Sequence, residues 1–220
     1  MKINTVLLDF DGTIMDTNDL IVRSWQHTFR ALTGADGPID EILRSFGEPL
    51  TDTIGRFFPD RDRDEVVRVY RDFHVDIFED AIRPFPGIRE MLEALKSEGY
   101  TLGLVTSRLA RTTRRGLKKF DLSHYFDSIV TEEDTERSKP DPAPILLSLD
   151  RLGKAPGEAI MIGDTLHDIG CARNAGVPVA LVSWTLAAPE SRRTGDNAPD
   201  FILETPESLI GLLRSYNAAV

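Results

Sequence analysis

The sequence predicts an α/β fold, a doubly wound parallel sheet with an inserted all-helical domain. Short apolar runs rich in β-branched residues recur along the chain, and helix-like segments separate most of them. Such alternation is typical of parallel strands whose two faces are covered by crossover helices. One stretch, from Asn18 to Ile82, interrupts the alternation because it has helical periodicity and no convincing strand pattern.

The expected strands are short, mostly apolar runs. They are Thr5–Leu8, Leu102–Val105, Ser128–Val130, Ala159–Ile162 and Pro178–Val182. The expected helices of the same domain are marked by proline, aspartate or glycine near their ends. They are Ile88–Ser97, Arg108–Phe120, Ala143–Leu152 and Asp168–Ala175. Together these segments predict a core of βα units.

The interrupting stretch is too long for a connecting loop, since loops in compact domains rarely exceed about 15 residues. Its apolar residues recur at helical spacing. The clearest are Leu20, Trp25, Phe29 and Leu32 and, further on, Val66, Val69, Tyr70, Phe73 and Ile77. We therefore expect residues 17–83 to form a helical cap domain, and residues 1–16 and 84–220 to form the α/β core. The polar stretch Pro189–Pro199 is expected to be a surface loop.

Composition and charge exclude several classes of protein. A net charge of −10 argues against a nucleic-acid partner, which needs a clustered cationic surface. No apolar run approaches the roughly 20 residues that span a bilayer, and the N-terminus lacks a signal-peptide pattern. The single cysteine, Cys171, has small neighbours and is expected to be a buried, inert thiol. We expect a cytoplasmic protein, monomer or dimer, with no nucleic-acid or membrane partner.

Two carboxylates follow the first expected strand. Asp9 and Asp11 come directly after the apolar run Val6–Leu8, at the carboxyl end of a strand, where open α/β sheets bind their ligands. Gly12 permits a tight turn with exposed amides and Thr13 adds a hydroxyl, a combination that suits a phosphate group. Taken alone, the same residues also describe a strand that simply ends in an acidic turn.

A second acidic set follows the strand Ala159–Ile162. Asp164 and Asp168 come after this strand, so they are expected at the same edge of the sheet as the first pair. Several carboxylates at one edge repel one another unless a divalent cation or protonation offsets their charge. Oxygen ligands suit Mg²⁺ better than Zn²⁺, and no cluster of Cys and His residues competes. The sequence therefore predicts a magnesium site.

Hydroxyl and cationic side chains complete the pattern. Thr106 and Ser107 end the strand Leu102–Val105 and offer hydroxyls and amides to a phosphoryl oxygen. Lys139 supplies a positive charge beside a bound phosphate, and Arg108 follows the Thr-Ser pair, so its backbone is expected near the same pocket. Each of these residues is ordinary by itself. Their order after the first two aspartates makes them informative.

These residues, in this order, resemble the four motifs of the haloacid dehalogenase superfamily. The corresponding segments are Asp9–Thr13, Thr106-Ser107, Lys139-Pro140 and Gly163-Asp164-Thr165 with Asp168. The helical insertion between the first and second motifs resembles the C1-type cap of that superfamily. The resemblance covers the core domain and implies a Rossmann-like core.

The resemblance implies a phosphohydrolase with a covalent intermediate. Asp9 would attack phosphorus and become an aspartyl-phosphate, and Asp11 would act as general acid and then as general base. Thr106 and Lys139 would hold the transferring phosphoryl group. The implied Mg²⁺ ligands are Asp9, the Asp11 backbone carbonyl and Asp164, with Asp168 as a ligand or as a partner of one.

Asp11 restricts which reactions of the superfamily are expected. Dehalogenating and phosphonate-cleaving members lack an acid/base carboxylate there, so Asp11 favours hydrolysis of phosphate esters or anhydrides. Mutases of the superfamily also have this carboxylate, so Asp11 is equally consistent with a mutase.

A closer resemblance, to the PpaX-type bacterial pyrophosphatases, extends into the cap and the last strand. It is carried by Asp16-Thr17-Asn18, Trp25–Phe29, Gly47–Thr53, Tyr70–Phe73 and Val182–Leu186. It implies that the substrate is inorganic pyrophosphate; the alternatives are phosphoglycolate and other small phosphomonoesters. The expected substrate contacts are Gly12, Thr13, Ser107 and Arg108 from the core and Asn18 and Gly47 from the cap. Arg23 and Arg44 are further cap candidates, though either suits a solvated helix face.

Two rival mechanisms fit the sequence less well. A receiver-like signalling module also carries an acidic cluster, a Ser or Thr and a Lys at strand ends, but it is much shorter and has its acceptor Asp on a middle strand. A phosphohistidine mechanism would leave the four carboxylates unexplained. Trp184 is expected either to line the mouth of the site or to be a packing residue after its strand.

Overall fold

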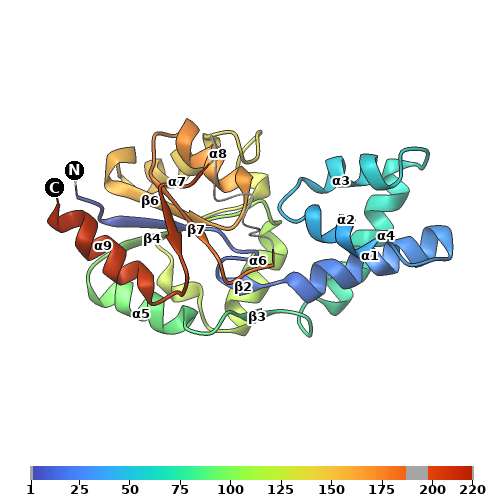
Figure 1. Ribbon diagram of the computed structural model, residues 1–220, viewed down its shortest axis with the longest axis horizontal. Coiled ribbons are helices and arrows are strands. Elements are labelled where there is room, and N and C mark those ends of the chain that lie inside the picture. The colour runs from blue at the N-terminus through green and yellow to red at the C-terminus, as the bar shows by residue number, and fades with distance from the viewer. Residues whose placement is uncertain (1, 187–197, 220) are drawn as a thin grey trace. The chain divides into compact units, whose positions relative to one another are not determined.

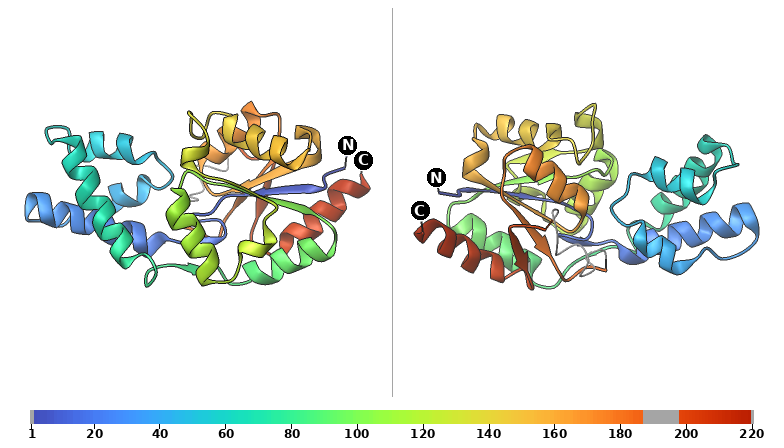
Figure 2. Two further views of the ribbon diagram at one scale, coloured as in Figure 1. Left: turned by 180° about the vertical axis from the view of Figure 1, so that it is seen from behind. Right: turned by 45° about the horizontal axis from the view of Figure 1, so that its top comes forward.

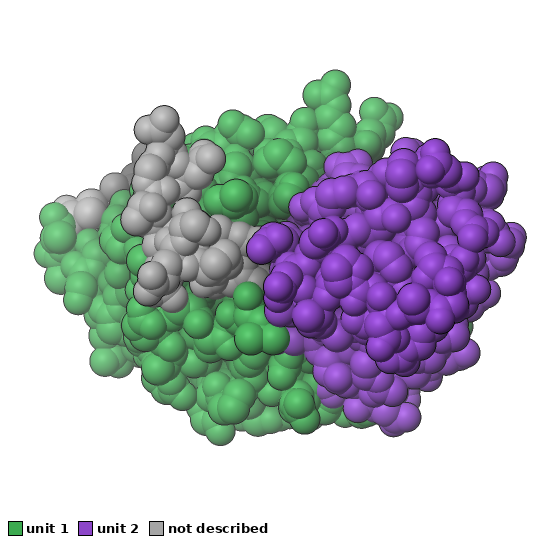
Figure 3. All heavy atoms as spheres, turned by 45° about the vertical axis from the view of Figure 1, so that its right-hand side comes forward, with its two compact units in different colours: residues 1–16, 83–220 green, residues 17–82 purple. Residues whose placement is uncertain are grey.

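The computed structural model describes residues 2–186 and 198–219, so most of the expected loop Pro189–Pro199 lies outside the described residues. The chain forms two compact units, residues 1–16 with 83–220 and residues 17–82, which are coloured separately in Figure 3. These bounds lie within one residue of those expected from the sequence. The assignment of the two units as a catalytic core and a cap stays a proposal.

The first unit contains a six-stranded sheet in the order β5-β4-β1-β6-β7-β8, and every neighbouring pair is parallel. The strands are β1 (Thr5–Leu8), β4 (Thr101–Val105), β5 (Ser128–Val130), β6 (Ala159–Gly163), β7 (Val179–Val182) and β8 (Phe201–Leu203). From β1 the chain first adds β4 and β5 on one side and then crosses to add β6, β7 and β8 on the other. The predicted doubly wound parallel sheet is therefore confirmed.

Helices cover both faces of this sheet. They are α5 (Ile88–Ser97), α6 (Ala110–Lys119), α7 (Ala143–Leu152), α8 (Leu166–Asn174) and α9 (Ser208–Ala218). Helices α7 and α8 pack together on one face, and α5 and α9 pack together on the other, as Figures 1 and 2 show. The strands are buried accordingly, since every residue of β1, β6 and β7 is buried.

Short elements complete the unit. The 3₁₀ helices are η1 (Ser123–Tyr125), η2 (Glu132–Asp134) and η3 (Pro156–Glu158). A two-residue antiparallel pair, β2 (Met15–Asp16) with β3 (Arg83–Pro84), joins the point where the chain leaves this unit to the point where it returns. Strand β8 and helix α9 were not predicted. Helix α8 begins two residues earlier than expected, because the Thr165 side chain caps it.

The second unit is all helical, as expected. Its helices are α1 (Asn18–Thr33), α2 (Ile39–Arg44), α3 (Leu50–Phe57) and α4 (Arg63–Ile77). Helices α1 and α4 pack along each other, with the Trp25 and Tyr70 rings 4.6 Å apart at the contact. Leu20 of α1 and Val66 of α4 are fully buried. The predicted apolar spacing therefore marks the faces that form the small core of this unit.

No helix among the described residues is both long enough and apolar enough to cross a membrane.

Candidate active site

The carboxyl ends of the central strands bring the first candidate residues together. Asp9 follows β1 directly, and its amide donates to the Ile162 carbonyl of β6 at 2.9 Å. Thr106 follows β4, and its amide donates to the Val130 carbonyl of β5 at 3.0 Å. Because β1 lies between β4 and β6, Asp9 stands where the strand order reverses. Open α/β sheets bind their ligands at this point.

A buried ion-pair triad joins Asp9 to residues far along the chain. The Lys139 Nζ donates to Asp9 Oδ1 at 2.8 Å and to Asp168 Oδ1 at 2.6 Å. The side chains of all three residues are at most 7% exposed. One ammonium therefore serves two carboxylates in a site from which bulk water is excluded, where a charge is costly unless it is paired.

The pKa values of the triad follow from burial and from this pairing. Burial raises the pKa of Asp9 to about 7, against the pull of Lys139, and the nearby Asp168 and Asp11 carboxylates raise it further. Burial opposes the charged form of Lys139, but Asp168 and Asp9 outweigh it and raise the pKa of this lysine. For Asp168, Lys139 and the Thr165 hydrogen bonds overcome burial and lower the pKa of the carboxyl. A further positive charge would stabilise the ionised form of Asp9.

The second oxygen of Asp168 is held by the start of α8. Oδ2 accepts hydrogen bonds from the Thr165 amide at 3.0 Å and from the Thr165 hydroxyl at 2.7 Å, and the Asp164 amide lies 3.3 Å away. The Thr165 side chain in turn accepts from the Asp168 amide, which completes a capping box. Gly163 allows this approach, since a Cβ there would lie 2.3 Å from the Asp168 Cγ.

Gly12 places the turn after β1 against Asp164. Its φ of +72° is a left-handed conformation that favours glycine. A Cβ at this position would lie 2.1 Å from Asp164 Oδ2, so any larger residue would displace that carboxylate. The turn is also tied to the strand end after β7, because the Trp184 indole donates to the Thr13 carbonyl at 3.0 Å. Trp184 therefore supports the turn.

Three carboxylates in this region form a suitable donor set for a divalent cation. Asp9, Asp164 and Asp168 are all buried, and each offers an oxygen within 4.8 Å of the others. The set consists only of carboxylate oxygens, the ligands that Mg²⁺ prefers. The residues therefore fit the predicted magnesium site.

Asp11 and Arg108 form a second ion pair beside the triad. Arg108 donates from Nε to Asp11 Oδ2 at 2.9 Å and Oδ1 at 3.2 Å, and from Nη2 to Oδ1 at 2.7 Å. The arginine side chain is 8% exposed and that of Asp11 is 28% exposed. The Arg108 amide lies beside the Thr106 hydroxyl, and the guanidinium is bound to a carboxylate, an arrangement that was not anticipated.

The comparison with known families agrees with these residues. The family model for haloacid dehalogenase-like hydrolases matches residues 6–182. The chain belongs to this family. It is therefore an enzyme of the hydrolase class, and the predicted resemblance is confirmed.

Individual members of the haloacid dehalogenase-like family resemble this chain over nearly its whole length. It is 36% identical to the pyrophosphatase PpaX of Bacillus cereus over 217 residues, which are 99% of each chain. A haloacid dehalogenase-like hydrolase from Streptococcus pneumoniae is 26% identical, with a TM-score of 0.85 over 96% of this chain and 98% of the other. A predicted phosphoglycolate phosphatase from Haemophilus somnus is 22% identical, with a TM-score of 0.82 over 96% and 98% of the two chains. The last likeness shows the fold alone.

Most of the expected site residues of this haloacid dehalogenase-like chain lie in the first unit. They are Asp9, Asp11, Gly12, Thr13, Thr106, Ser107, Arg108, Lys139, Asp164 and Asp168. Asn18 begins α1, and Gly47, with a φ of +80°, lies between α2 and α3, so both belong to the second unit. Thr165 belongs to the fourth motif, but its role as the cap of α8 was not predicted, although a Thr followed by an acidic residue at the third position is a known signal for a helix start.

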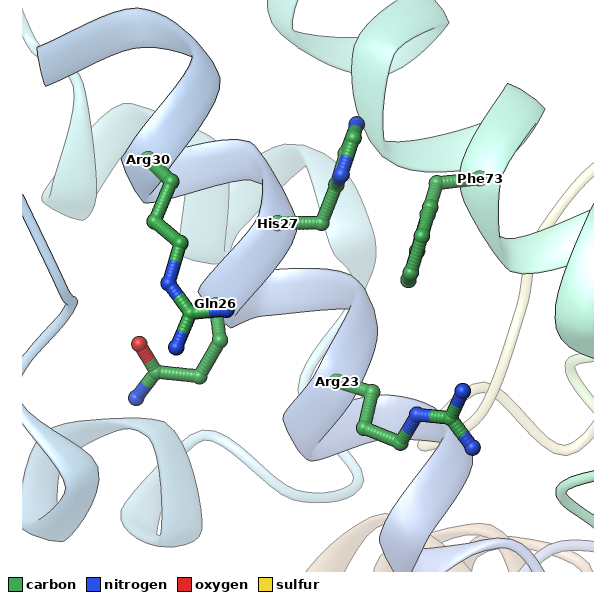
Figure 4. Close-up of a pocket in the computed structure, with 5 residues that line it drawn as sticks. All are labelled: Arg23, Gln26, His27, Arg30 and Phe73. Carbon is green, nitrogen blue, oxygen red and sulfur yellow. The ribbon is translucent and has the colours of Figure 1, made fainter. Parts of the chain in front are cut away.

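The second unit has a surface pocket of about 370 Å³ between α1 and α4, shown in Figure 4. The His27 ring stacks on Phe73 there, with the ring centroids 4.0 Å apart. Arg23 and Arg30 flank the rings, and they pair with Asp19 and Asp36 respectively. The residues that line the pocket include no carboxylate, but they include Arg23, one of the cap candidates for substrate contact.

Cys171 is buried, as predicted. Its side chain is inaccessible, and the thiol donates to the Asp141 carbonyl at 3.0 Å. Burial raises the pKa of the Cys171 thiol to about 12.

Proposed function

We propose that this protein is a Mg²⁺-dependent phosphohydrolase that forms an aspartyl-phosphate on Asp9 and acts on inorganic pyrophosphate. The observation that carries the proposal is the buried Asp9 carboxylate, 2.8 Å from the Lys139 ammonium at the switch point of the sheet. A nucleophile needs an ionised form, and a neighbouring cation favours ionisation in a site where burial opposes it.

In the proposed mechanism, Asp9 is the nucleophile and Asp11 is the general acid and base. A carboxylate oxygen of Asp9 bonds to phosphorus as the bond to the leaving oxygen breaks, and Asp11 gives a proton to that oxygen. Asp11 then takes a proton from water, whose oxygen attacks the phosphorus of the aspartyl-phosphate and releases Asp9 and inorganic phosphate. Lys139 and the Thr106 hydroxyl hold the transferring phosphoryl oxygens.

Asp9, Asp164 and the Asp11 backbone carbonyl are the proposed metal ligands. Asp168 is better described as a partner of Lys139 and of the α8 cap, because both of its oxygens already accept hydrogen bonds from these groups. When bound, Mg²⁺ neutralises negative charge that would otherwise keep the Asp9 carboxylate away from an anionic phosphate.

Relatives support pyrophosphate as the substrate. The likeness to pyrophosphatase PpaX covers 99% of both chains at 36% identity. The second candidate is phosphoglycolate or another small phosphomonoester, the alternative that the sequence resemblance leaves open. Gly12, Thr13 and Ser107 of the core are proposed substrate contacts, and Asn18 and Gly47 stay predictions for the cap.

The decisive experiment measures phosphate release by purified protein with Mg²⁺ from pyrophosphate, phosphoglycolate, sugar phosphates and nucleotides. We expect the highest kcat/KM with pyrophosphate. A higher value with phosphoglycolate would overturn the substrate and leave the mechanism standing.

The mechanism is tested with Asp9→Asn, which we expect to be inactive yet folded, because burial already opposes the charge that the substitution removes. The exposed Asp150, at the end of α7, provides a matched control, since Asp150→Asn should retain wild-type rates. Asp11→Asn should accumulate the aspartyl-phosphate that the wild type hydrolyses at once. Wild-type rates in Asp9→Asn would refute the nucleophile. A wild-type phosphoprotein that never turns over would favour the receiver-like alternative.

A further inference from the structure

Arg108 is built into the loop after β4 in a way that leaves its backbone little freedom. The Arg108 amide donates to the Thr106 hydroxyl oxygen at 3.2 Å, and the Arg108 carbonyl accepts from the Glu132 amide at 3.1 Å. One residue beyond Leu109, the Ala110 amide donates to a Glu133 carboxylate oxygen at 2.7 Å. Arg108 therefore starts from a fixed point beside Thr106, a residue proposed to hold phosphate.

The side chain is equally constrained. Its guanidinium carbon lies 5.6 Å from the centroid of the fully buried Phe10 ring, which belongs to the same turn as Asp9 and Asp11. Only 8% of the arginine side chain is exposed. A guanidinium that is stacked on an aromatic ring and shielded from water keeps its direction.

The Arg108 guanidinium is directed at the Asp11 carboxylate. Arg108 contacts both carboxylate oxygens, a bidentate geometry that fixes the plane of the acceptor as well as its distance. Asp11 needs such support because its side chain is 28% exposed, so water competes for its oxygens. A lysine would supply the charge without the planar fork.

We propose that Arg108 is a positioning residue that acts through Asp11, holding this carboxylate in the orientation required for proton transfer. The inference deepens the proposed function and rests on the acid/base role of Asp11 stated there. General acid–base catalysis needs heavy-atom distances of about 2.6–3.2 Å, and a misplacement of about 1 Å can cost about 100-fold in rate. The sequence-based expectation that Arg108 binds substrate directly is the competing assignment.

A double-mutant cycle separates the two assignments. It compares the wild type, Arg108→Ala, Asp11→Asn and the double variant in steady-state hydrolysis of pyrophosphate and of p-nitrophenyl phosphate. We expect Arg108→Ala to lower kcat about 100-fold with little change in KM. In the Asp11→Asn background the same substitution should cost less than about 3-fold, since a residue that acts through Asp11 has nothing left to position.

Two further variants guard against a purely structural explanation. Arg111→Ala, at an exposed position of α6 three residues away, should keep wild-type kinetics. Arg108→Lys retains the charge and most of the side-chain volume but loses the planar guanidinium that contacts both oxygens of Asp11, so it tests the bidentate contact even if the alanine variant unfolds. The kcat of Arg108→Lys should fall at least about 10-fold. Added guanidinium should partly restore Arg108→Ala and should not restore the double variant.

The possible failures are distinct. Losses that multiply in the double variant, or a raised KM at unchanged kcat, would overturn the positioning role and assign Arg108 to substrate binding. A wild type that hydrolyses none of pyrophosphate, phosphoglycolate and p-nitrophenyl phosphate would refute the proposed function, and the role of Arg108 with it.

Discussion

Replacing Lys139 by methionine tests the buried triad directly. Methionine has a similar length and no charge, so Lys139→Met removes the ammonium that lies 2.8 Å from Asp9 and 2.6 Å from Asp168. Two buried carboxylates then face each other without a cation. We expect the folded state to be strongly destabilised.

The magnitude follows from the pairing. Breaking a buried ion pair by removing one partner costs about 3–5 kcal/mol. The lower end applies here, because Asp9, with a pKa raised to about 7, can take up a proton near neutral pH and relieve the repulsion. For a chain of 220 residues, 1 kcal/mol corresponds to about 2–4 °C in Tm. A loss of about 3 kcal/mol therefore lowers Tm by about 6–12 °C.

The assay is thermal unfolding followed by circular dichroism at pH 7 in EDTA. Lys118→Met is the matched control, since Lys118 is exposed on α6 and its replacement should change stability by less than about 0.5 kcal/mol. Mg²⁺ should raise the Tm of Lys139→Met more than that of the wild type, because the variant lacks the native positive charge. A Tm for Lys139→Met within about 2 °C of the wild type would refute the triad as a stabilising element.

Three other predictions concern the turn, the thiol and the metal. Gly12→Ala should abolish activity, and it should lower Tm by more than Gly99→Ala does. Both glycines have positive φ, but only at Gly12 would the new Cβ meet Asp164. Equal Tm losses in the two variants would contradict this reasoning. Cys171 should react with iodoacetamide only after unfolding, since at a pKa of about 12 about one thiol in 10,000 is ionised at pH 8; rapid labelling of native protein would oppose it. EDTA should remove phosphatase activity and Mg²⁺ should restore it, whereas full activity without divalent cations would exclude the proposed cofactor.

Residues that sit at strand ends were predictable from sequence. The apolar run before Asp9 and the run before Asp164 each identify a buried strand, and parallel strands bring their carboxyl ends to one edge. The structure brings Lys139 into contact with Asp9 and Asp168, while the catalytic roles of these residues stay proposals.

Other features depend on contacts that no local pattern encodes. The Asp11–Arg108 pair joins residues 97 positions apart, and it requires side-chain directions as well as strand order. Helix α6 begins at Ala110 and not at Arg108, because the extended backbone before it lets the Arg108 carbonyl accept from Glu132. Strand β8 is apolar, but it is only three residues long and lies at the sheet edge with Ile202 exposed, so it is too short to show the periodicity of a strand.

The shared use of Asp168 has a consequence for how this enzyme can change. One oxygen of the Asp168 carboxylate accepts a hydrogen bond from the Thr165 hydroxyl at the start of α8, and the other accepts one from the Lys139 ammonium, which lies beside Asp9. A substitution at this position therefore alters the start of α8 and the charge balance at Asp9 together, so selection cannot adjust one without the other. Variants that modulate the rate while sparing the fold must arise elsewhere, around groups such as Arg108, which contacts the Asp11 carboxylate and leaves the start of α8 intact.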